Sequence, residues 1–307
     1  MNKDENLTGQ LAMVSFIVCV DLDRDAPFPV KGISYAVSMP LQEKLTSELR
    51  EPVSSAVIEG TGKGLSLLID VLNDLDIPAV FFHEARTLAL LKEFYPVVID
   101  QLKTLDIQHG LHGLDHEDFS GNLTGVKLTK VKQEKLIYEG KKLVQDSLDV
   151  KINIFRAPYM EPGEHLFDLL VNAGIYQDSS YYKEATAAIA PEITGELVEF
   201  PVIRTPKRSA FDGMYTYLWP LFEGNRSLED VTANYLSLLA NSKNQENRSP
   251  NTSFISLNLH TWHFAYLVKE KRYFREVEME RKSNEFRKLL LSLKKTGEDF
   301  TTFDTLL

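Results

Sequence analysis

The stretch 107-IQHGLHGLDHED-118 places a short apolar run directly before two histidines that stand four residues apart. We expect residues 107–111 to form a strand that delivers His112 and His116. At helical spacing the two imidazoles lie one turn apart, so both can face one cation. Gly110 and Gly113 relax the backbone where bulkier residues would crowd that cation. A lone His-x-x-x-His pair is more often structural, so a metal site requires further ligands elsewhere in the chain.

Runs of strand length alternate with runs of helical apolar spacing along the chain. Predicted strands span residues 11–20, 77–82, 107–111, 152–155, 175–180, 197–203 and 254–260. Predicted helices span residues 63–75, 88–105, 130–148, 164–173, 228–239 and 277–293. Alternating strands and helices are typical of a parallel α/β architecture.

The length of 307 residues allows one large α/β domain. We predict a single catalytic domain over residues 1–307, with insertions at about 25–61 and 205–226. The first insertion is irregular, contains four prolines and includes a short helix near residues 42–50. Its GTGKG run at 60–64 lacks the Ser or Thr of a phosphate-binding loop, so we expect a flexible lead into the next helix. Residues 241–251 form a polar loop.

Chemically active side chains directly follow predicted strands: Asp21, Asp23, His112, Arg156, Asp178 and His260. In parallel α/β folds the chemistry lies at the carboxyl ends of the strands. The strand period of two places Asp21 and Asp23 on the same face. One carboxylate and two neutral imidazoles make a divalent metal site with open positions for water and substrate. We therefore predict Asp23, His112 and His116 as metal ligands and Asp21 as the general base.

Each of these residues also has a simpler structural interpretation. A strand-end Asp-x-Asp often caps a loop or helix, Arg156 is typical of a surface residue before a proline turn, and Asp178-Ser-Ser180 is typical of a helix cap. We expect the remaining histidines, His83, His109, His165 and His263, to be structural. The order of the motifs favours the catalytic interpretation.

At this point the sequence resembles the polysaccharide deacetylase family, also called the NodB-homology or carbohydrate esterase 4 group. Five motifs carry the resemblance: Asp21-Leu-Asp23, His112-Gly-Leu-Asp-His116, Arg156-Ala-Pro-Tyr159, Asp178-Ser-Ser180 and Leu259-His260. The resemblance implies a distorted (β/α) barrel with seven or eight strands. It also implies one divalent ion, zinc first and cobalt, nickel or manganese as alternatives.

The resemblance assigns roles to the matching residues. Asp21 is the base, Arg156 orients it, and the backbone N–H of Tyr159 faces the oxyanion. His260 is the general acid, and we expect Asp178 to stabilise its imidazolium. The implied activity is hydrolysis of a non-peptide C–N (amide) bond, a deacetylation or deformylation of an N-acyl amino sugar.

Two departures from the family pattern bear on the substrate. The first motif lacks Asp-Asp-Gly-Pro, and Gly113 replaces the usual Ser or Thr, as in the intracellular branch of the family. Asn258 replaces a leucine that floors the acyl pocket. It either makes that floor polar, which suits a formyl or ureido group, or only bonds the backbone. The alternatives are therefore an allantoinase-like ureide or cyclic-amide hydrolase, and a catalytically silent carbohydrate-binding protein.

Composition limits the partners. A net charge of -10 and the lack of a basic run argue against nucleic acid. The chain has one cysteine, Cys19, and its N-terminus is acidic, so we expect a cytoplasmic protein. No stretch approaches an apolar run of about 20 residues, so we expect no transmembrane segment. The substrate is a small-molecule or sugar-linked acyl amide, and a lipid-linked one stays open. The aromatic stretch 213–222 is either a core segment or lid, or a part that contacts a membrane.

Overall fold

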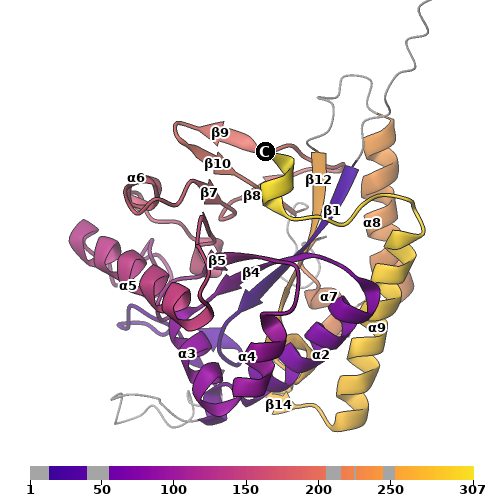
Figure 1. Ribbon diagram of the computed structural model, residues 1–307, viewed down its shortest axis with the longest axis horizontal. Coiled ribbons are helices and arrows are strands. Elements are labelled where there is room, and N and C mark those ends of the chain that lie inside the picture. The colour runs from indigo at the N-terminus through magenta and orange to yellow at the C-terminus, as the bar shows by residue number, and fades with distance from the viewer. Residues whose placement is uncertain (1–13, 40–54, 205–215, 225, 245–252) are drawn as a thin grey trace, which may run out of the picture.

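The computed structural model describes residues 14–39, 55–204, 216–224, 226–244 and 253–307. Its main sheet has eight strands that curl into an open barrel (Figure 1). Their spatial order is β12 (Ser253–His260), β1 (Val14–Leu22), β4 (Ala79–His83), β5 (Ile107–Leu111), β6 (Ile154–Phe155), β7 (Gln177–Asp178), β10 (Leu197–Glu199) and β9 (Glu192–Thr194). The first seven run parallel, and β9 is antiparallel to β10. This architecture confirms the predicted α/β fold class.

The two longest strands, β1 and β12, pair at one edge of the main sheet. Eight of the nine residues of β1 are buried, because its β-branched and aromatic side chains are covered on both faces. The two strands run in parallel register from Val14 opposite Ser253 to Asp21 opposite His260. Two candidate catalytic residues, 239 positions apart in the chain, are therefore neighbours at one strand end.

Helices cover the outside of the curled sheet (Figure 1). They are α2 (Glu59–Leu75), α3 (Ala85–Phe94), α4 (Pro96–Leu102), α5 (Lys130–Leu148), α6 (Leu166–Asn172), α7 (Trp219–Phe222), α8 (Leu228–Lys243) and α9 (Glu276–Lys294). Among the described residues, none of these helices is long and apolar enough to cross a membrane.

Short elements complete the described chain and lie in its connections. The 3-10 helices are η1 (Ser55–Val57), η2 (Pro158–Met160), η3 (Thr261–Phe264) and η4 (Phe303–Leu306). Three small two-stranded sheets pair β2 (Pro27–Phe28) with β3 (Val37–Ser38), β8 (Tyr182–Glu184) with β11 (Val202–Arg204), and β13 (Tyr266–Leu267) with β14 (Arg272–Tyr273). The connections η2 and η3 follow strands β6 and β12, where they carry parts of the site.

Prolines explain two differences from the predicted elements. The predicted helix at 88–105 is two helices, because Tyr95 adopts a non-helical conformation and Pro96 begins α4. The predicted strand at 197–203 is β10 and β11, which pair in different sheets. Pro201, between them, has no N–H for a sheet ladder.

The prediction of a flexible lead at 60–64 is wrong. These residues belong to α2, which packs against η3. A Cβ on Gly64 would stand 1.9 Å from the carbonyl oxygen of Thr261, so only glycine permits this approach. The insertion at 25–61 is also less irregular than expected, since it contains β2, β3 and the start of α2. The short helix predicted at 42–50 lies outside the described residues.

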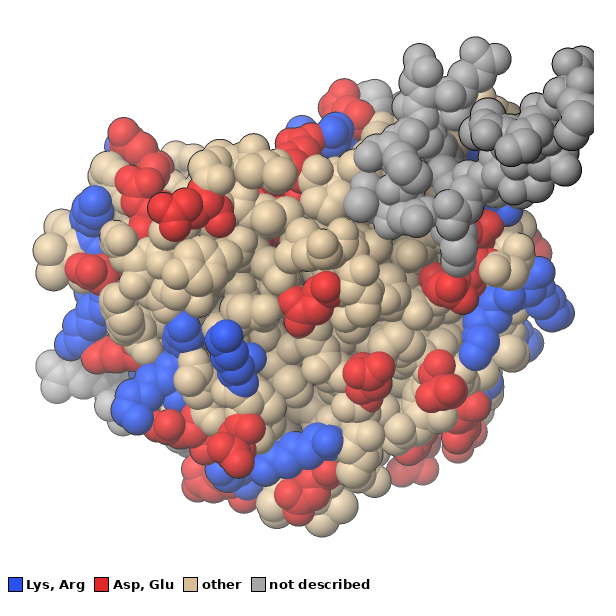
Figure 2. Space-filling view, turned by 45° about the horizontal axis from the view of Figure 1, so that its top comes forward, with Lys and Arg blue, Asp and Glu red and all other residues tan. Residues whose placement is uncertain are grey.

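Charged side chains are interspersed on the face shown in Figure 2. Lys and Arg side chains lie among Asp and Glu side chains around a largely uncharged centre.

The polar loop predicted at 241–251 starts later than expected, because α8 continues to Lys243. Residues 245–252 lie outside the described part of the chain.

Candidate metal and catalytic site

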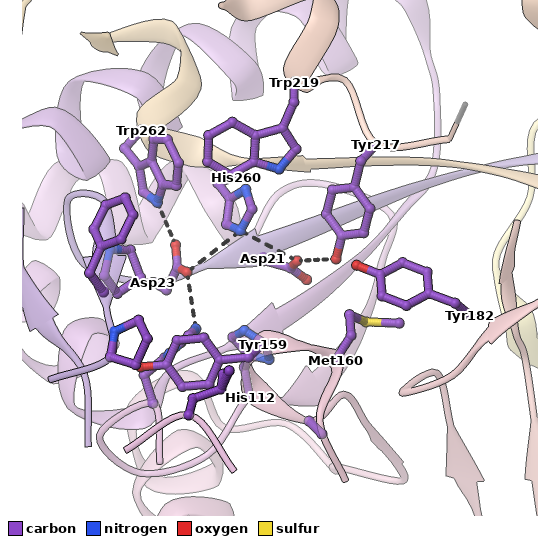
Figure 3. Close-up of a pocket in the computed structure, with 16 residues that line it drawn as sticks. Asp21, Asp23, His112, Tyr159, Met160, Tyr182, Tyr217, Trp219, His260 and Trp262 are labelled. Atoms are coloured by element: carbon purple, nitrogen blue, oxygen red, sulfur yellow. Dashed lines mark hydrogen bonds and ion pairs between the residues drawn. The ribbon is translucent and has the colours of Figure 1, made fainter. Parts of the chain in front are cut away.

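A cavity of about 320 Å³ opens where the carboxyl ends of β1, β5, β6 and β12 meet (Figure 3). Six of the predicted site residues line it: Asp21, Asp23, His112, His116, Tyr159 and His260. Aromatic and apolar side chains, among them Tyr217, Trp219 and Met160, make up much of the remaining wall. The structure thus brings together residues that come from four separate strand ends.

Asp23, His112 and His116 form a compact, buried cluster. Each offers one ligand atom, and these atoms lie within 4.8 Å of one another. His112 Nδ1 lies 2.8 Å from the carbonyl oxygen of Arg156. Since a carbonyl only accepts, Nδ1 carries the proton and Nε2 keeps its lone pair, as a metal ligand requires.

Two neutral imidazoles and an unpartnered carboxylate oxygen in this cluster suit a divalent cation. Burial lowers the pKa of His112 and of His116 to about 4, so both imidazoles are neutral near pH 7. Asp23 Oδ1 accepts from Trp262 Nε1 at 2.8 Å, whereas no donor among the described residues reaches the buried Oδ2. Burial raises the pKa of Asp23 well above its usual range. An unpartnered buried carboxylate oxygen is costly, and a bound cation would satisfy it.

The helical turn expected between His112 and His116 is wrong. Both residues lie in an irregular loop after β5, with positive φ angles of 79° at Gly113 and 56° at His116. The carboxylate of Glu117 accepts hydrogen bonds from the backbone N–H groups of Leu114 and Asp115, which stabilises this turn in place of a helix. The imidazoles still meet, with ring centroids 4.8 Å apart.

Asp21 accepts one hydrogen bond on each carboxylate oxygen. Arg156 Nη1 donates to Oδ1 at 2.9 Å, and the Tyr217 hydroxyl donates to Oδ2 at 2.9 Å. Burial alone would raise the pKa of Asp21, but the charge of Arg156 together with His112, His260 and the Tyr217 hydrogen bond outweighs it, and the pKa falls to about 2. Asp21 is therefore ionised at neutral pH and can accept a proton.

Arg156 is completely buried, which excludes the surface interpretation. Its Nε donates to the carbonyl oxygen of Ser179, and its Nη2 donates to Ser179 Oγ and Asn258 Oδ1. The guanidinium also packs on the ring of Phe82 at 4.1 Å. These contacts hold Arg156 rigidly against Asp21.

Asn258 does not floor the pocket. Its Nδ2 donates to the carbonyl oxygen of Thr216 at 3.0 Å and to Ser256 Oγ at 2.9 Å, while its Oδ1 accepts from Arg156. The side chain is fully buried and lies outside the cavity lining. The idea that it makes the acyl pocket polar is therefore wrong.

Tyr159 has a positive φ of 61°, and Met160 after it has one of 57°. Such angles are rare without glycine and cost about 1–3 kcal/mol each, so the surrounding contacts must hold this turn. The Tyr159 ring packs edge-on against His116, with centroids 4.5 Å apart. The oxyanion role of its backbone N–H stays a prediction.

Asp178 does not support His260. Its carboxylate accepts from the N–H and hydroxyl of Ser180, and the Ser180 Oγ accepts from the N–H of Ala157. Among the described residues, the carboxylates within 4 Å of His260 are those of Asp21 and Asp23. Through Ser180, Asp178 thus holds the backbone at Ala157, two residues before Tyr159, instead of stabilising the imidazolium of His260.

His260 Nε2 faces both acids, at 3.8 Å from Asp21 Oδ2 and 3.8 Å from Asp23 Oδ2 (Figure 3). Its ring stacks on Trp262 with centroids 4.6 Å apart. Burial lowers the pKa of His260, and the two carboxylates oppose this. The backbone N–H of His260 donates to His263 Nδ1 at 3.1 Å, so His263 has the structural role expected of it.

Only a weak pattern in the sequence indicates Tyr217 and Trp219. Both belong to the aromatic stretch 213–222, and both line the cavity, whereas Phe222 stacks on His263 in the core. The core interpretation thus describes this stretch best, although its residues 213–215 lie outside the described part. An aromatic pair two residues apart was the available clue.

Comparison with protein families gives one match, over part of the chain. The family profile described as Polysaccharide deacetylase matches residues 60–177, which include His112, His116 and Arg156 but neither Asp21 nor His260. No curated protein gives a significant match.

Solved structures share the fold at low sequence identity. A protein assigned as a polysaccharide deacetylase from Mycobacterium smegmatis superposes with a TM-score of 0.62 at 13% identity, covering 97% of this chain and 89% of that one. Puue allantoinase gives 0.63 at 10% identity, covering 98% and 91%. A protein assigned as a polysaccharide deacetylase from Pseudomonas aeruginosa PAO1 gives 0.57 at 12% identity, covering 96% and 90%. The profile match and the shared fold confirm the resemblance to the polysaccharide deacetylase family.

Proposed function

We propose that the protein is a metal-dependent amidohydrolase that removes an acyl group from an N-acyl amino sugar. The observation that carries the proposal is Asp23 Oδ2. This buried carboxylate oxygen has no hydrogen-bond donor among the described residues, and it lies 3.4 Å from His116 Nε2 in a cavity that also holds Asp21 and His260.

Asp23, His112 and His116 would hold one divalent ion, with zinc as the first expectation and cobalt, nickel or manganese as alternatives. Such an ion acidifies water and polarises an amide carbonyl when it is bound. The hydrogen bonds from His112 to Arg156 O and from Trp262 to Asp23 orient two of the three ligands.

The chain's own residues would carry the proton transfers. Asp21, ionised and held by Arg156, accepts a proton from the attacking water. The backbone N–H of Tyr159 would stabilise the negative charge that develops on the acyl carbonyl oxygen. His260 would deliver a proton to the departing amine, which leaves poorly unless it is protonated. His260 Nε2 lies 3.8 Å from Asp21 Oδ2. A small movement of either side chain would therefore let the proton pass from Asp21 to His260.

One of the two alternatives has support from a comparison. The fold likeness to Puue allantoinase favours a ureide or cyclic-amide hydrolase as the second candidate. A catalytically silent carbohydrate-binding protein would keep the cavity and its aromatic wall, but it would not need an ionised Asp21 opposite His260. The single cysteine favours a cytoplasmic location.

The test is turnover by the zinc- or cobalt-loaded protein and by the chelated protein on a panel of N-acetyl and N-formyl amino sugars, allantoin and a linear ureide. Metal-dependent release of acetate or formate from the sugars would support the proposal. Turnover of ureides alone would favour the second candidate. Sugar binding without release of any acid, in the metal-loaded protein, would favour the silent binding protein.

A further inference from the structure

Tyr217 contacts the candidate base from a segment distant in sequence. Its hydroxyl donates to Asp21 Oδ2 at 2.9 Å, across 196 positions of the chain (Figure 3). The backbone around Tyr217 is bound to β12, since Asn258 N–H donates to Thr216 O at 2.6 Å and Leu218 N–H donates to Asn258 O at 2.9 Å. The strand that carries His260 therefore also positions Tyr217.

The two oxygens of Asp21 are held by two independent donors. Arg156 Nη1 holds Oδ1, and the Tyr217 hydroxyl holds Oδ2, which is the oxygen that lies 3.8 Å from His260 Nε2. A single donor on Oδ1 would leave the carboxylate free to turn about its Cβ–Cγ bond. Two donors on opposite oxygens define its plane, and the second lone pair of Oδ2 stays directed at the cavity.

We propose that Tyr217 is a positioning residue, which keeps Asp21 Oδ2 oriented toward the attacking water and His260. This inference rests on the proposed hydrolase function. Misplacement of a reacting group by about 1 Å costs on the order of 100-fold in rate, so an unfixed base would slow the chemical step.

Packing contacts that do not involve the hydroxyl hold the Tyr217 ring in place. It is 4% exposed and packs with Met160 and Val202, and its centroid lies 6.4 Å from that of Tyr182. Tyr217→Phe therefore removes the hydrogen bond to Asp21 and keeps the packing of the ring.

Tyr235 supplies a matched control. Its ring is also buried. Its hydroxyl donates to the carbonyl oxygen of Thr216 at 3.3 Å, one residue from Tyr217, and not to Asp21. Tyr235→Phe makes the same chemical change in the same segment. A general loosening of that segment would appear in both variants.

The experiment measures kcat, KM and metal content of the loaded wild type, Tyr217→Phe and Tyr235→Phe on the best substrate of the panel above. We expect Tyr217→Phe to lower kcat about 10- to 100-fold, with KM and metal content within about twofold of the wild type. We expect Tyr235→Phe to keep kcat within about twofold.

Three results would overturn the inference about Tyr217 alone: a wild-type kcat in Tyr217→Phe, an equal loss of kcat in both variants, or a loss in Tyr217→Phe that appears in KM or metal content. A wild type that binds metal and turns over none of the panel would instead reject the proposed function, and the role of Tyr217 with it.

Discussion

Arg156 Nη1 lies 2.9 Å from Asp21 Oδ1, and neither side chain is more than 2% exposed. The pair joins the end of β6 to the end of β1, although β4 and β5 lie between these strands in the sheet. The guanidinium spans this distance over the ring of Phe82 on β4. One buried ion pair therefore ties the curled sheet together at the point where the site opens.

Loss of this pair should be costly. Arg156→Met leaves Asp21 buried without its charged partner, and breaking a buried ion pair in this way costs about 3–5 kcal/mol in free energy of unfolding. Urea denaturation of the variant and the wild type measures it. Arg86→Ala is the control, since it breaks the more exposed pair with Asp115 and should cost about 0–1 kcal/mol. Equal costs for the two variants would contradict this picture.

Gly64 should not tolerate a side chain. Gly64→Ala places a Cβ 1.9 Å from Thr261 O, so α2 or η3 must move, and overpacking of this kind costs about 1–3 kcal/mol. Thermal and urea unfolding measure the loss. Lys63→Ala is the neighbouring control, because Lys63 is half exposed and its ion pair with Glu59 contributes little. A Gly64→Ala variant as stable as Lys63→Ala would show that the close approach is wrong.

The stability of the protein should fall in acid partly because of His109. Burial lowers the pKa of His109 from 6.5 to about 4. Below pH 6.5 the unfolded chain binds a proton there and the folded chain does not, so the free energy of unfolding decreases as the pH falls toward 4.

Urea denaturation at pH 7, 5.5 and 4.5 measures this contribution. The wild type should lose stability more steeply over this range than His109→Gln, which lacks the titrating group. Parallel pH profiles for the two proteins would contradict the assigned burial of His109.

The two aspartates of the first motif should separate into different roles. Asp21→Asn should keep its metal and lose about 10²- to 10⁴-fold in kcat, the usual contribution of a general base. Asp23→Ala should lose the metal itself. Elemental analysis and turnover of both variants test this division, and near-normal rates in Asp21→Asn would show that Asp21 is not the base.

Much of the site could be predicted because each strand end is visible in the sequence. Asp21, Asp23, His112 and His260 all follow apolar runs, and parallel strands bring such ends together. The shape of the loop that holds His112 and His116 could not be predicted from their spacing, because a positive φ and the Glu117 carboxylate decide it.

Contacts between segments distant in the chain could not be predicted from the sequence. The hydroxyl of Tyr217 reaches Asp21 only because residues 216–218 pair with β12, which no local pattern reveals. Asn258 bonds the backbone, as one interpretation expected, but it also binds Arg156 and Ser256, which the sequence does not indicate. Asp178 binds Ser180 instead of His260, because a residue's position in a family motif does not specify where its carboxylate points. The requirement for glycine at 64 likewise depends on the packing of α2 against η3.

The most direct test of the account is the elemental metal content of the purified protein beside that of His116→Ala. The account predicts about one divalent ion per chain in the wild type, as expected for a three-ligand catalytic site, and its loss in the variant. No bound ion in either protein, even after zinc or cobalt has been offered, would contradict the metal-dependent mechanism.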